Sequence, residues 1–422
     1  MVQEGMAGPS VHQKTMFQRR IFASDTCLSS PSAGSSSIRG TFLSRIETPC
    51  PLLRLTHGSL PYCTKDLVQE IPWNFLGQLE MADLLTLNKS LSHKHITSEL
   101  FNRPSNQKDI ISARHIEGGV TSTSARGVSI NLLTGRKILS NEEYIRRLIM
   151  EQPICPVNDG ISSSFCCKGN ISDDTYIIIS MGDEVPFNSS QKRYNKAVER
   201  TDQWFKELRS CDKLNWENTF LFGVVQGSVD DMSNLGHIAR ERIQDGANGI
   251  AIGGSGMGES IDALNTVVNE VRFSIGGDIP ILVQGIDTVD DIISVVQNGA
   301  DIVSTNLPQI MTIAGLAMCF LDHMQTQENN NDHRTQNFTP PSPLYTIINV
   351  RNSTNRTDSS PILDSCRCHA CRHYSRAYIY HLFKAHELLG EILLHTHNQW
   401  QLFELFRILR GVEDIECRSR DD

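Results

Sequence analysis

The segment Cys366-Arg-Cys368-His-Ala-Cys371 is the most informative stretch of this sequence, and two histidines, His395 and His397, follow it in Leu-His-Thr-His-Asn. Cysteines with this spacing can direct three sulfur atoms to one point from a single tight turn. Three thiolates and one imidazole form the closed tetrahedral donor set of structural zinc. Ordinary buried cysteines are the alternative, but chance rarely combines this spacing with a suitably placed histidine. The sequence therefore predicts one structural zinc ion, with His395 or His397 as the fourth ligand.

The residues around this cluster resemble a known protein family. The zinc segment of tRNA-guanine transglycosylases is similar to the run from Cys366 to Leu382, and the similarity continues in Glu387-Leu-Leu-Gly390 and His397-Asn398. The match extends back to about Arg39 and so covers most of the chain. Members of this family exchange an anticodon guanine for a 7-deazaguanine base. The resemblance implies that one zinc ion per chain is bound by Cys366, Cys368, Cys371 and His397.

Composition and charge describe a globular protein and exclude a generally basic nucleic-acid binder. Of the 422 residues, 39% are hydrophobic and 21% are charged, and the net charge is −9. Any contact with RNA must therefore use a local basic patch or a partner chain. The cysteine cluster favours a reducing compartment, and no apolar run is long enough to span a bilayer. We expect a cytoplasmic protein, with peripheral association with the mitochondrial outer membrane as an open alternative.

The chain divides into four parts by composition. Residues 1–37 are rich in Ser, with Arg19 and Arg20 among apolar residues; a transit peptide is one interpretation, and a disordered extension is the one we expect. A barrel domain is predicted over 38–422, with a polar insertion at 322–343 and a zinc sub-domain at about 344–400. Cys155, Cys166 and Cys167 lack ligand spacing with any nearby histidine and are interpreted as incidental.

Short apolar runs alternate with amphipathic stretches in the second half of the chain. A wholly apolar strand followed by a helix, repeated, predicts a parallel sheet covered on both faces. A doubly wound sheet would look similar locally, whereas the family resemblance favours a (β/α)8 barrel. The resemblance implies a first hairpin around Arg39–Pro49, and the residues themselves predict a short helix over Asn141–Met150. The predicted strands are Tyr176–Ser180, Phe220–Val225, Gly249–Ile252, Ile279–Val283 and Asp301–Ser304.

Residues at the carboxyl ends of barrel strands carry the chemistry of such folds. The resemblance places a base-recognising aspartate at Asp183, a base-contacting amide at Gln226, and a glycine pair against the heterocycle at Gly253 and Gly254. Glycine allows that close approach because it has no Cβ atom. From the residues alone, Asp183 is equally well explained as a loop carboxylate that caps the following helix.

The position of the family's nucleophile is changed. Active members attack the ribose with an aspartate that follows a Gly-x-Asp-x-Phe run, and a Pro-Thr-Arg comes next. Here Ser304 stands at the position of that aspartate, and Gln309-Ile310 replaces Thr-Arg. A serine hydroxyl is a poor nucleophile without an adjacent base. Asp301 belongs to the strand itself, and no Asp-Ser-Gly-Gly-Phe-Gln motif occurs between residues 83 and 150, so no catalytic residue is predicted.

Retention of the scaffold without the reacting groups is typical of a subunit that supports another chain. The resemblance implies a non-catalytic accessory member, paired as a heterodimer with a catalytic queuine tRNA-ribosyltransferase subunit. Through that complex it would act on the wobble position of tRNAs with G-U-N anticodons, and weak self-association is a further expectation. Two alternatives stay open: a divergent active transglycosylase, and a zinc-containing RNA-binding barrel outside base exchange.

Overall fold

A computed structural model of the chain describes residues 17–22, 37–42, 46–56, 58–86, 107–114, 123–124, 127–132, 134–152, 175–227, 232–320 and 345–411. The predicted polar insertion at 322–343 and the cysteines between 155 and 167 lie outside these ranges. The chain forms two compact units. The first unit comprises residues 1–60, 74–306 and 409–411, and the second comprises 61–73, 307–408 and 412–422.

The first unit is a closed barrel of eight parallel strands, so the predicted barrel is confirmed and an open doubly wound sheet is excluded. Closure comes from the pairing of β14 with β4 and of β10 with β6. In the order of the barrel, the strands are β10 (Tyr176–Ile179), β11 (Thr219–Gln226), β12 (Gly249–Gly253), β13 (Ile281–Gln284), β14 (Ile302–Thr305), β4 (Cys50–Arg54), β5 (Phe75–Glu80) and β6 (Gln107–Ser112).

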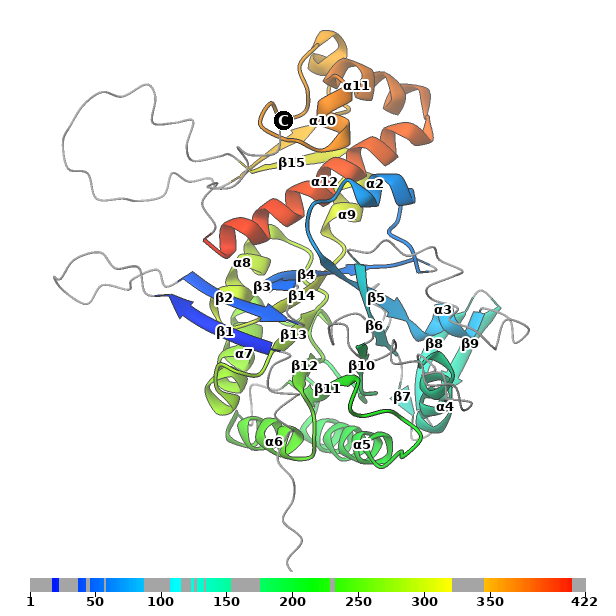
Figure 1. The fold of residues 1–422 in the computed structure, drawn as a ribbon, viewed down its shortest axis with the longest axis vertical. Helices are drawn as coiled ribbons and strands as arrows, with labels where there is room; N and C mark the ends of the chain where they lie inside the picture. Colours follow the sequence, from blue (N-terminus) through cyan, green and yellow to red (C-terminus); the bar gives the residue numbers. More distant parts are fainter. Residues whose placement is uncertain are drawn as a thin grey trace, which may run out of the picture. The chain divides into compact units, whose positions relative to one another are not determined.

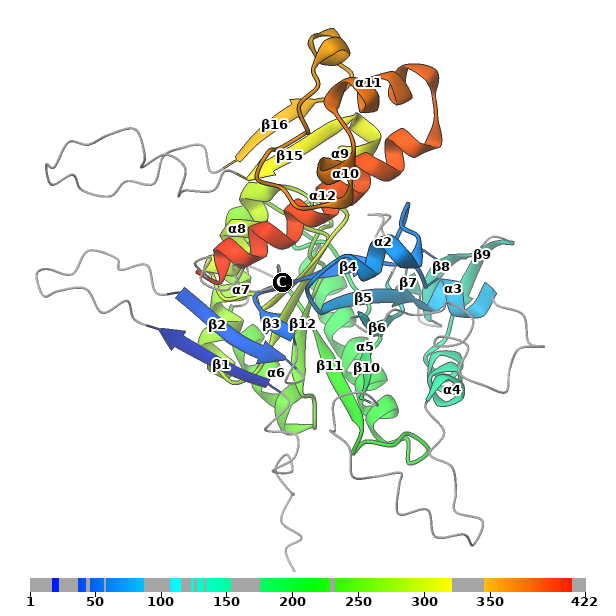
Figure 2. The ribbon, with the colours of Figure 1, turned by 45° about the horizontal axis from the view of Figure 1, so that its top comes forward.

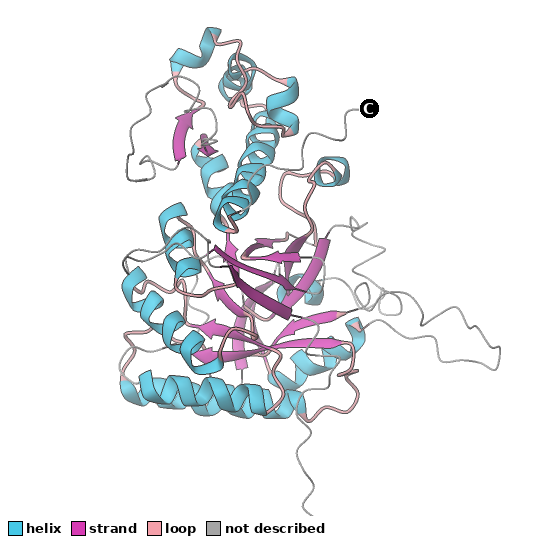
Figure 3. Ribbon diagram, turned by 60° about the vertical axis from the view of Figure 1, so that its left-hand side comes forward, coloured by secondary structure: helices cyan, strands magenta, loops and turns pink. Residues whose placement is uncertain are grey.

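Helices cover the outside of this barrel (Figures 1 and 3). They are α5 (Gln191–Arg209), α6 (Met232–Gln244), α7 (Ile261–Ile275) and α8 (Val289–Gln297). Hydroxyl caps fix where two of them begin: the Ser260 side chain accepts from the Ala263 amide, and the Thr288 side chain accepts from the Asp291 amide. The apolar residues of α8 recur at helical spacing and are buried against the sheet, which is why the sequence predicted this helix.

An early excursion from the barrel adds a small sheet and a helix. The sheet contains β7 (Thr123–Ser124), β8 (Gly127–Leu132) and β9 (Gly135–Leu139), and α3 (Met81–Thr86) follows β5. Helix α4 (Asn141–Glu151) matches the predicted short helix, and the Ser140 side chain caps it by accepting from the Glu143 amide. The Tyr144 hydroxyl donates to the Ile179 carbonyl at 2.6 Å, which anchors α4 to β10.

The predicted first hairpin is confirmed as β2 (Ser37–Phe42) and β3 (Ile46–Thr48). Its Phe42 is fully buried and packs edge-on against Phe220 near the start of β11, with ring centroids 4.9 Å apart. The hairpin therefore fills the amino end of the barrel with apolar side chains. A further strand, β1 (Phe17–Phe22), pairs antiparallel with β2 and lies within the segment that was predicted to be a disordered extension.

The second unit is built on one long helix, α12 (Leu388–Leu409) (Figure 2). Segment 61–73, which contains α2 (Lys65–Gln69), belongs to it through Trp73, whose ring lies 5.0 Å from Trp400 and 5.4 Å from Phe403. The unit is thus larger than the predicted sub-domain at 344–400. Its other elements are α9 (Leu307–Ala314), β15 (Leu316–Phe320), β16 (Tyr345–Asn349), the 3-10 helix η3 (Ser353–Thr357), α10 (His369–His373) and α11 (Arg376–Ala385).

None of the helices in the described ranges combines the length and the apolar character required to cross a membrane.

The burial of Phe42 from the β2–β3 hairpin at the amino end of the barrel gives a prediction about stability. Phe42→Ala should lower the free energy of unfolding of the barrel by about 3 to 5 kcal/mol, because it leaves a cavity among fully buried rings. Phe273→Ala is the matched control, since this ring is 85% exposed and its loss should change stability by less than about 0.5 kcal/mol. Urea denaturation of both variants measures the difference in their free energies of unfolding. Equal losses of stability would contradict the stabilising role of Phe42.

Candidate functional site: the sulfur cluster and the mouth of the barrel

The three cysteines and His397 come together in the second unit. Cys366 and Cys368 precede α10, Cys371 lies within it, and His397 comes from α12. All four side chains are buried, and their ligand atoms lie within 4.8 Å of one another. The His397 Nδ1 atom is 3.7 Å from the sulfurs of Cys366 and Cys368 and 3.3 Å from that of Cys371.

The surroundings of this group fit a metal ion. The Nε2 atom of His397 lies 2.8 Å from the Met318 carbonyl oxygen, which accepts its proton and leaves the Nδ1 lone pair facing the sulfurs. The Cys371 amide donates to the Cys368 sulfur, and the Gln401 side chain donates to the Cys366 sulfur, both at 3.4 Å. Hydrogen bonds from the Cys366 and Cys368 thiols hold the pKa of Cys371 well below its usual value. The group could therefore hold a metal ion.

The structure separates the two candidate histidines. His395 is buried with its Nδ1 atom 3.5 Å from the Thr312 hydroxyl, and its ring lies 5.2 Å from that of Tyr62. Burial lowers the pKa of His395 to about 4, so this ring is neutral. Two residues that are two positions apart on a helix point to different faces of that helix. Of the two histidines, His397 is the one that faces the sulfurs.

In the first unit, the side chain at the expected nucleophile position is hydrogen-bonded to a side-chain amide. Ser304 is completely buried at the carboxyl end of β14, and its hydroxyl donates to the Gln78 Oε1 atom at 3.3 Å. The Gln284 side chain donates to the same oxygen at 3.0 Å. Asp301 lies at the opposite end of the strand, where it accepts from the Ile281 amide at 2.9 Å and pairs with Arg272.

Asp183, the expected base-recognising residue, turns toward helix α5. Its carboxylate is fully buried and accepts from Arg193 at 2.8 and 2.5 Å and from Arg200 at 2.9 Å. Both oxygens are therefore engaged by guanidinium groups of the helix layer. The role of Asp183 in base binding stays a prediction. The alternative prediction, that Asp183 caps the following helix, is wrong, because Ser190 is the first residue before α5 and Asp183 instead forms a buried ion pair with two arginines of that helix.

The adjacent carboxylate, Glu184, faces the mouth of the barrel and was not singled out from the sequence. Its Oε2 atom accepts from Arg114 Nη1 at 2.6 Å and from the Gly254 amide at 2.9 Å. Arg114 follows β6, and its Nη2 atom also donates to the Ser255 carbonyl. Side chains alternate along an extended segment, so Asp183 and Glu184 point in opposite directions. That alternation was the signal that could have identified Glu184.

The other predicted base-binding residues lie together around Glu184. Gln226 is buried, and its side chain donates to the Val185 carbonyl at 2.8 Å; its Oε1 atom has no hydrogen-bond partner among the described residues. Gly254 has a φ of 82°, in the left-handed region, and a Cβ atom there would lie 2.3 Å from the Val185 carbonyl oxygen. The cavity bounded by Arg114 and Glu184 measures about 10 Å³, enough for about one water molecule.

Comparison with known proteins identifies the family. The family model described as queuine tRNA-ribosyltransferase matches residues 171–412, more than half of the chain. The chain belongs to the queuine tRNA-ribosyltransferase family. The barrel strands β4, β5 and β6 lie before the matched region, yet they complete the closed sheet.

Individual relatives match over different lengths. The queuine tRNA-ribosyltransferases of Clostridium acetobutylicum and Prochlorococcus marinus are 31% and 30% identical over 243 and 240 residues, which is 56% of this chain in each case. The chain thereby spans only 58% and 56% of those relatives. The queuine tRNA-ribosyltransferase accessory subunit 2 of Schizosaccharomyces pombe is 26% identical over 398 residues, covering 91% of this chain and 79% of that protein.

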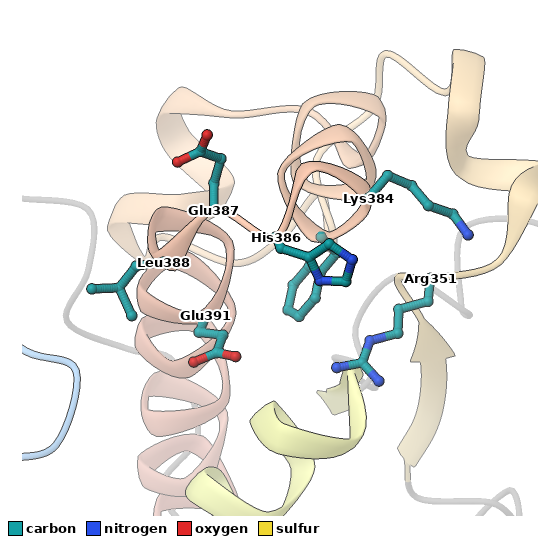
Figure 4. A pocket seen from close by; sticks show the side chains of 7 residues that line it. Arg351, Lys384, His386, Glu387, Leu388 and Glu391 are labelled. Atoms are coloured by element: carbon teal, nitrogen blue, oxygen red, sulfur yellow. The ribbon is translucent and has the colours of Figure 1, made fainter.

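This family member also has a hollow of about 460 Å³ in its second unit, which the sequence did not indicate (Figure 4). It lies at the turn between α11 and α12. Arg351 and Lys384 approach from one side and Glu387 and Glu391 from the other, with His386 between them. Since cations and carboxylates share this hollow, it is not the uniformly basic surface that binds a polyanion.

The sulfur cluster predicts how metal binding responds to substitution. Cys368→Ser should weaken metal binding by at least about 100-fold, since changes outside the ligand set alone cost roughly 10- to 100-fold. His397→Ala should do the same, whereas His395→Ala should keep the metal. Cys211→Ser is the control, because this thiol lies outside the group. The metal content of the purified variants is the measurement. Loss of metal in His395→Ala but not in His397→Ala would make His395 the fourth ligand.

Proposed function

We propose that this chain is the non-catalytic accessory subunit of a heterodimeric queuine tRNA-ribosyltransferase. It would support exchange of guanine for queuine at the wobble position of tRNAs with G-U-N anticodons, while a catalytic partner performs the reaction. The observation that carries the proposal is Ser304, which occupies the expected nucleophile position and is bonded to an amide. The reaction needs a carboxylate there that attacks the ribose and stabilises positive charge.

The neighbours of Ser304 support this proposal. A serine becomes nucleophilic when a base takes its proton, and the group that accepts here is the neutral Gln78 amide. The Gln284 amide fixes the same oxygen, so Gln78 cannot turn without breaking two hydrogen bonds. Strand β6, an early strand of the barrel, ends at Ser112 and is followed by Ala113-Arg114, so the Asp-Ser-Gly-Gly-Phe-Gln motif is not present there.

The share of this chain that each relative matches supports the accessory role. The relative with accessory subunit 2 in its name matches 91% of this chain, whereas the bacterial transferases match 56%. The additional matched length lies outside the region common to the family. A chain related over 91% of its length to an accessory subunit is better explained as one of that kind than as a divergent enzyme.

We further propose that the metal of the sulfur cluster is zinc. Three thiolates and one imidazole prefer zinc among common divalent ions and form a closed site without an open position for water. The ion would add folding energy to the second unit by joining the α10 turn to α12. This chain's own residues complete the coordination sphere, so the site would be structural.

The central prediction concerns base exchange. Incorporation of labelled guanine or queuine into a tRNA with a G-U-N anticodon should be absent with this chain alone and should require the catalytic partner. Ser304→Ala should leave the rate of the pair unchanged within about twofold, and Ser304→Asp should not confer activity on this chain alone. The control is a pair whose catalytic partner lacks its nucleophilic aspartate. Turnover by this chain alone, with a covalent RNA adduct, would establish a divergent enzyme instead.

A further prediction concerns assembly. Light scattering of the co-expressed chains should give a 1:1 complex, and the isolated chain should self-associate only weakly. We expect the surface of α11 to take part, where Tyr378 is 39% exposed and stacks on Tyr374 at 5.4 Å. Tyr378→Glu should weaken the complex by about 10-fold or more, whereas Phe273→Glu on the barrel unit should not. A chain that remains monomeric with the partner present would contradict the heterodimer.

A further inference from the structure

Arg114 bridges the ends of separate barrel strands. It follows β6, its Nη1 atom donates to Glu184 after β10 at 2.6 Å, and its Nη2 atom donates to the Ser255 carbonyl after β12. We propose that the guanidinium group of Arg114 occupies, as an internal ligand, a site that would bind a flat molecule with two N–H donors on one edge. The inference rests on the proposed function and deepens it, because it makes Arg114 the residue that prevents the barrel from taking a free base.

The site around Arg114 is constructed from fixed groups. The Glu184 carboxylate is oriented by the Gly254 amide at 2.9 Å. The Ser255 hydroxyl donates to the Ile252 carbonyl and accepts from the backbone N–H of Gln284. The two side chains of the ion pair are only 13% and 11% exposed. An acceptor pair held in this way is available to any planar group that offers two donors on one edge.

The backbone leaves room for such a flat group. Gly285 has a φ of 79°, and the Arg114 Nη2 atom lies 3.7 Å from the position that a Cβ atom would take at Gly285. With Arg114 in place, the adjoining cavity measures about 10 Å³. No heterocycle can enter this space unless the arginine side chain leaves it.

The ligand class follows from the donor pattern. A guanidinium ion presents two parallel N–H groups to a carboxylate, and the N1–C2-amino edge of a 2-amino-6-oxopurine presents the same pair. Arg114 offers this pattern to Glu184 and the Ser255 carbonyl from within the chain. An opened site should therefore accept a free guanidinium ion or guanine, but not an ammonium ion of equal charge.

Chemical rescue of an arginine-deleted variant tests this inference. Arg114→Ala in the full chain should lower the Tm by about 5 °C or more, since it leaves the Glu184 carboxylate buried without its cation. Guanidinium chloride at about 10 mM, far below denaturing concentrations, should restore at least half of that loss. Sodium chloride and methylammonium chloride at the same concentration should not. Calorimetry should show saturable guanidinium binding to the variant and none to the parent.

Arg193→Ala is the matched control, because it also removes a guanidinium from a buried carboxylate but lies in the helix layer, where Arg200 still pairs with Asp183. We expect no specific rescue of this variant. If Arg114→Ala does not fold, Arg114→Gln keeps part of the side chain, and its soluble yield and Tm should rise with guanidinium in the same way.

Two results would overturn the inference: binding of guanine by the parent chain as tightly as by Arg114→Ala, or the absence of guanidinium-specific rescue in both variants. Neither result bears on the base-exchange assay, which tests the accessory role separately. Conversely, turnover by the parent chain alone would refute the accessory role even if Arg114→Ala were rescued. The two failures are thus distinguishable.

Discussion

Buried polar groups need hydrogen-bond partners, and at the mouth of this barrel several of them bond to one another. Eight parallel strands bring their carboxyl ends to one edge, where an active enzyme would leave donors and acceptors for its substrate. Here Gln78 accepts from Ser304 and Gln284, and Glu184 is satisfied by Arg114 and the Gly254 amide. A substrate would have to replace these internal bonds, so the same interactions that stabilise the fold close the site.

The second unit depends on a different constraint. Its short elements bury few apolar residues each, and they are joined to α12 by the sulfur cluster and by the aromatic contacts of Trp73. A metal ion held by these four protein ligands would bind the segments together without any exposed reactive position. A unit of this kind can keep its shape while the chemistry of the barrel changes, which is consistent with a role in assembly.

Under the proposed accessory role, this chain would be a scaffold that has outlasted an activity. Ser304 stands where the family resemblance places the nucleophilic carboxylate, and the barrel wall around it is apolar and closed. Retained family features such as Gln226 and the Gly253–Gly254 turn have structural reasons to persist: the amide bonds the Val185 carbonyl, and a Cβ atom at Gly254 would clash with that carbonyl. Their presence alone does not indicate base binding.

The sequence alone determined the strands and helices of the second half of the barrel and the cysteine cluster, because these depend on local periodicity and on residue identity, whereas strands β4, β5 and β6 were not predicted. The tertiary structure decided three further points. It selected His397 over His395, because the packing of α12 fixes which of its faces is turned toward the sulfurs, and His397 lies on that face. It turned Asp183 outward to Arg193 and Arg200 and Glu184 inward. It also brought Arg114 to Ser255, 141 residues away, because barrel closure creates contacts between strand ends that local sequence patterns do not encode.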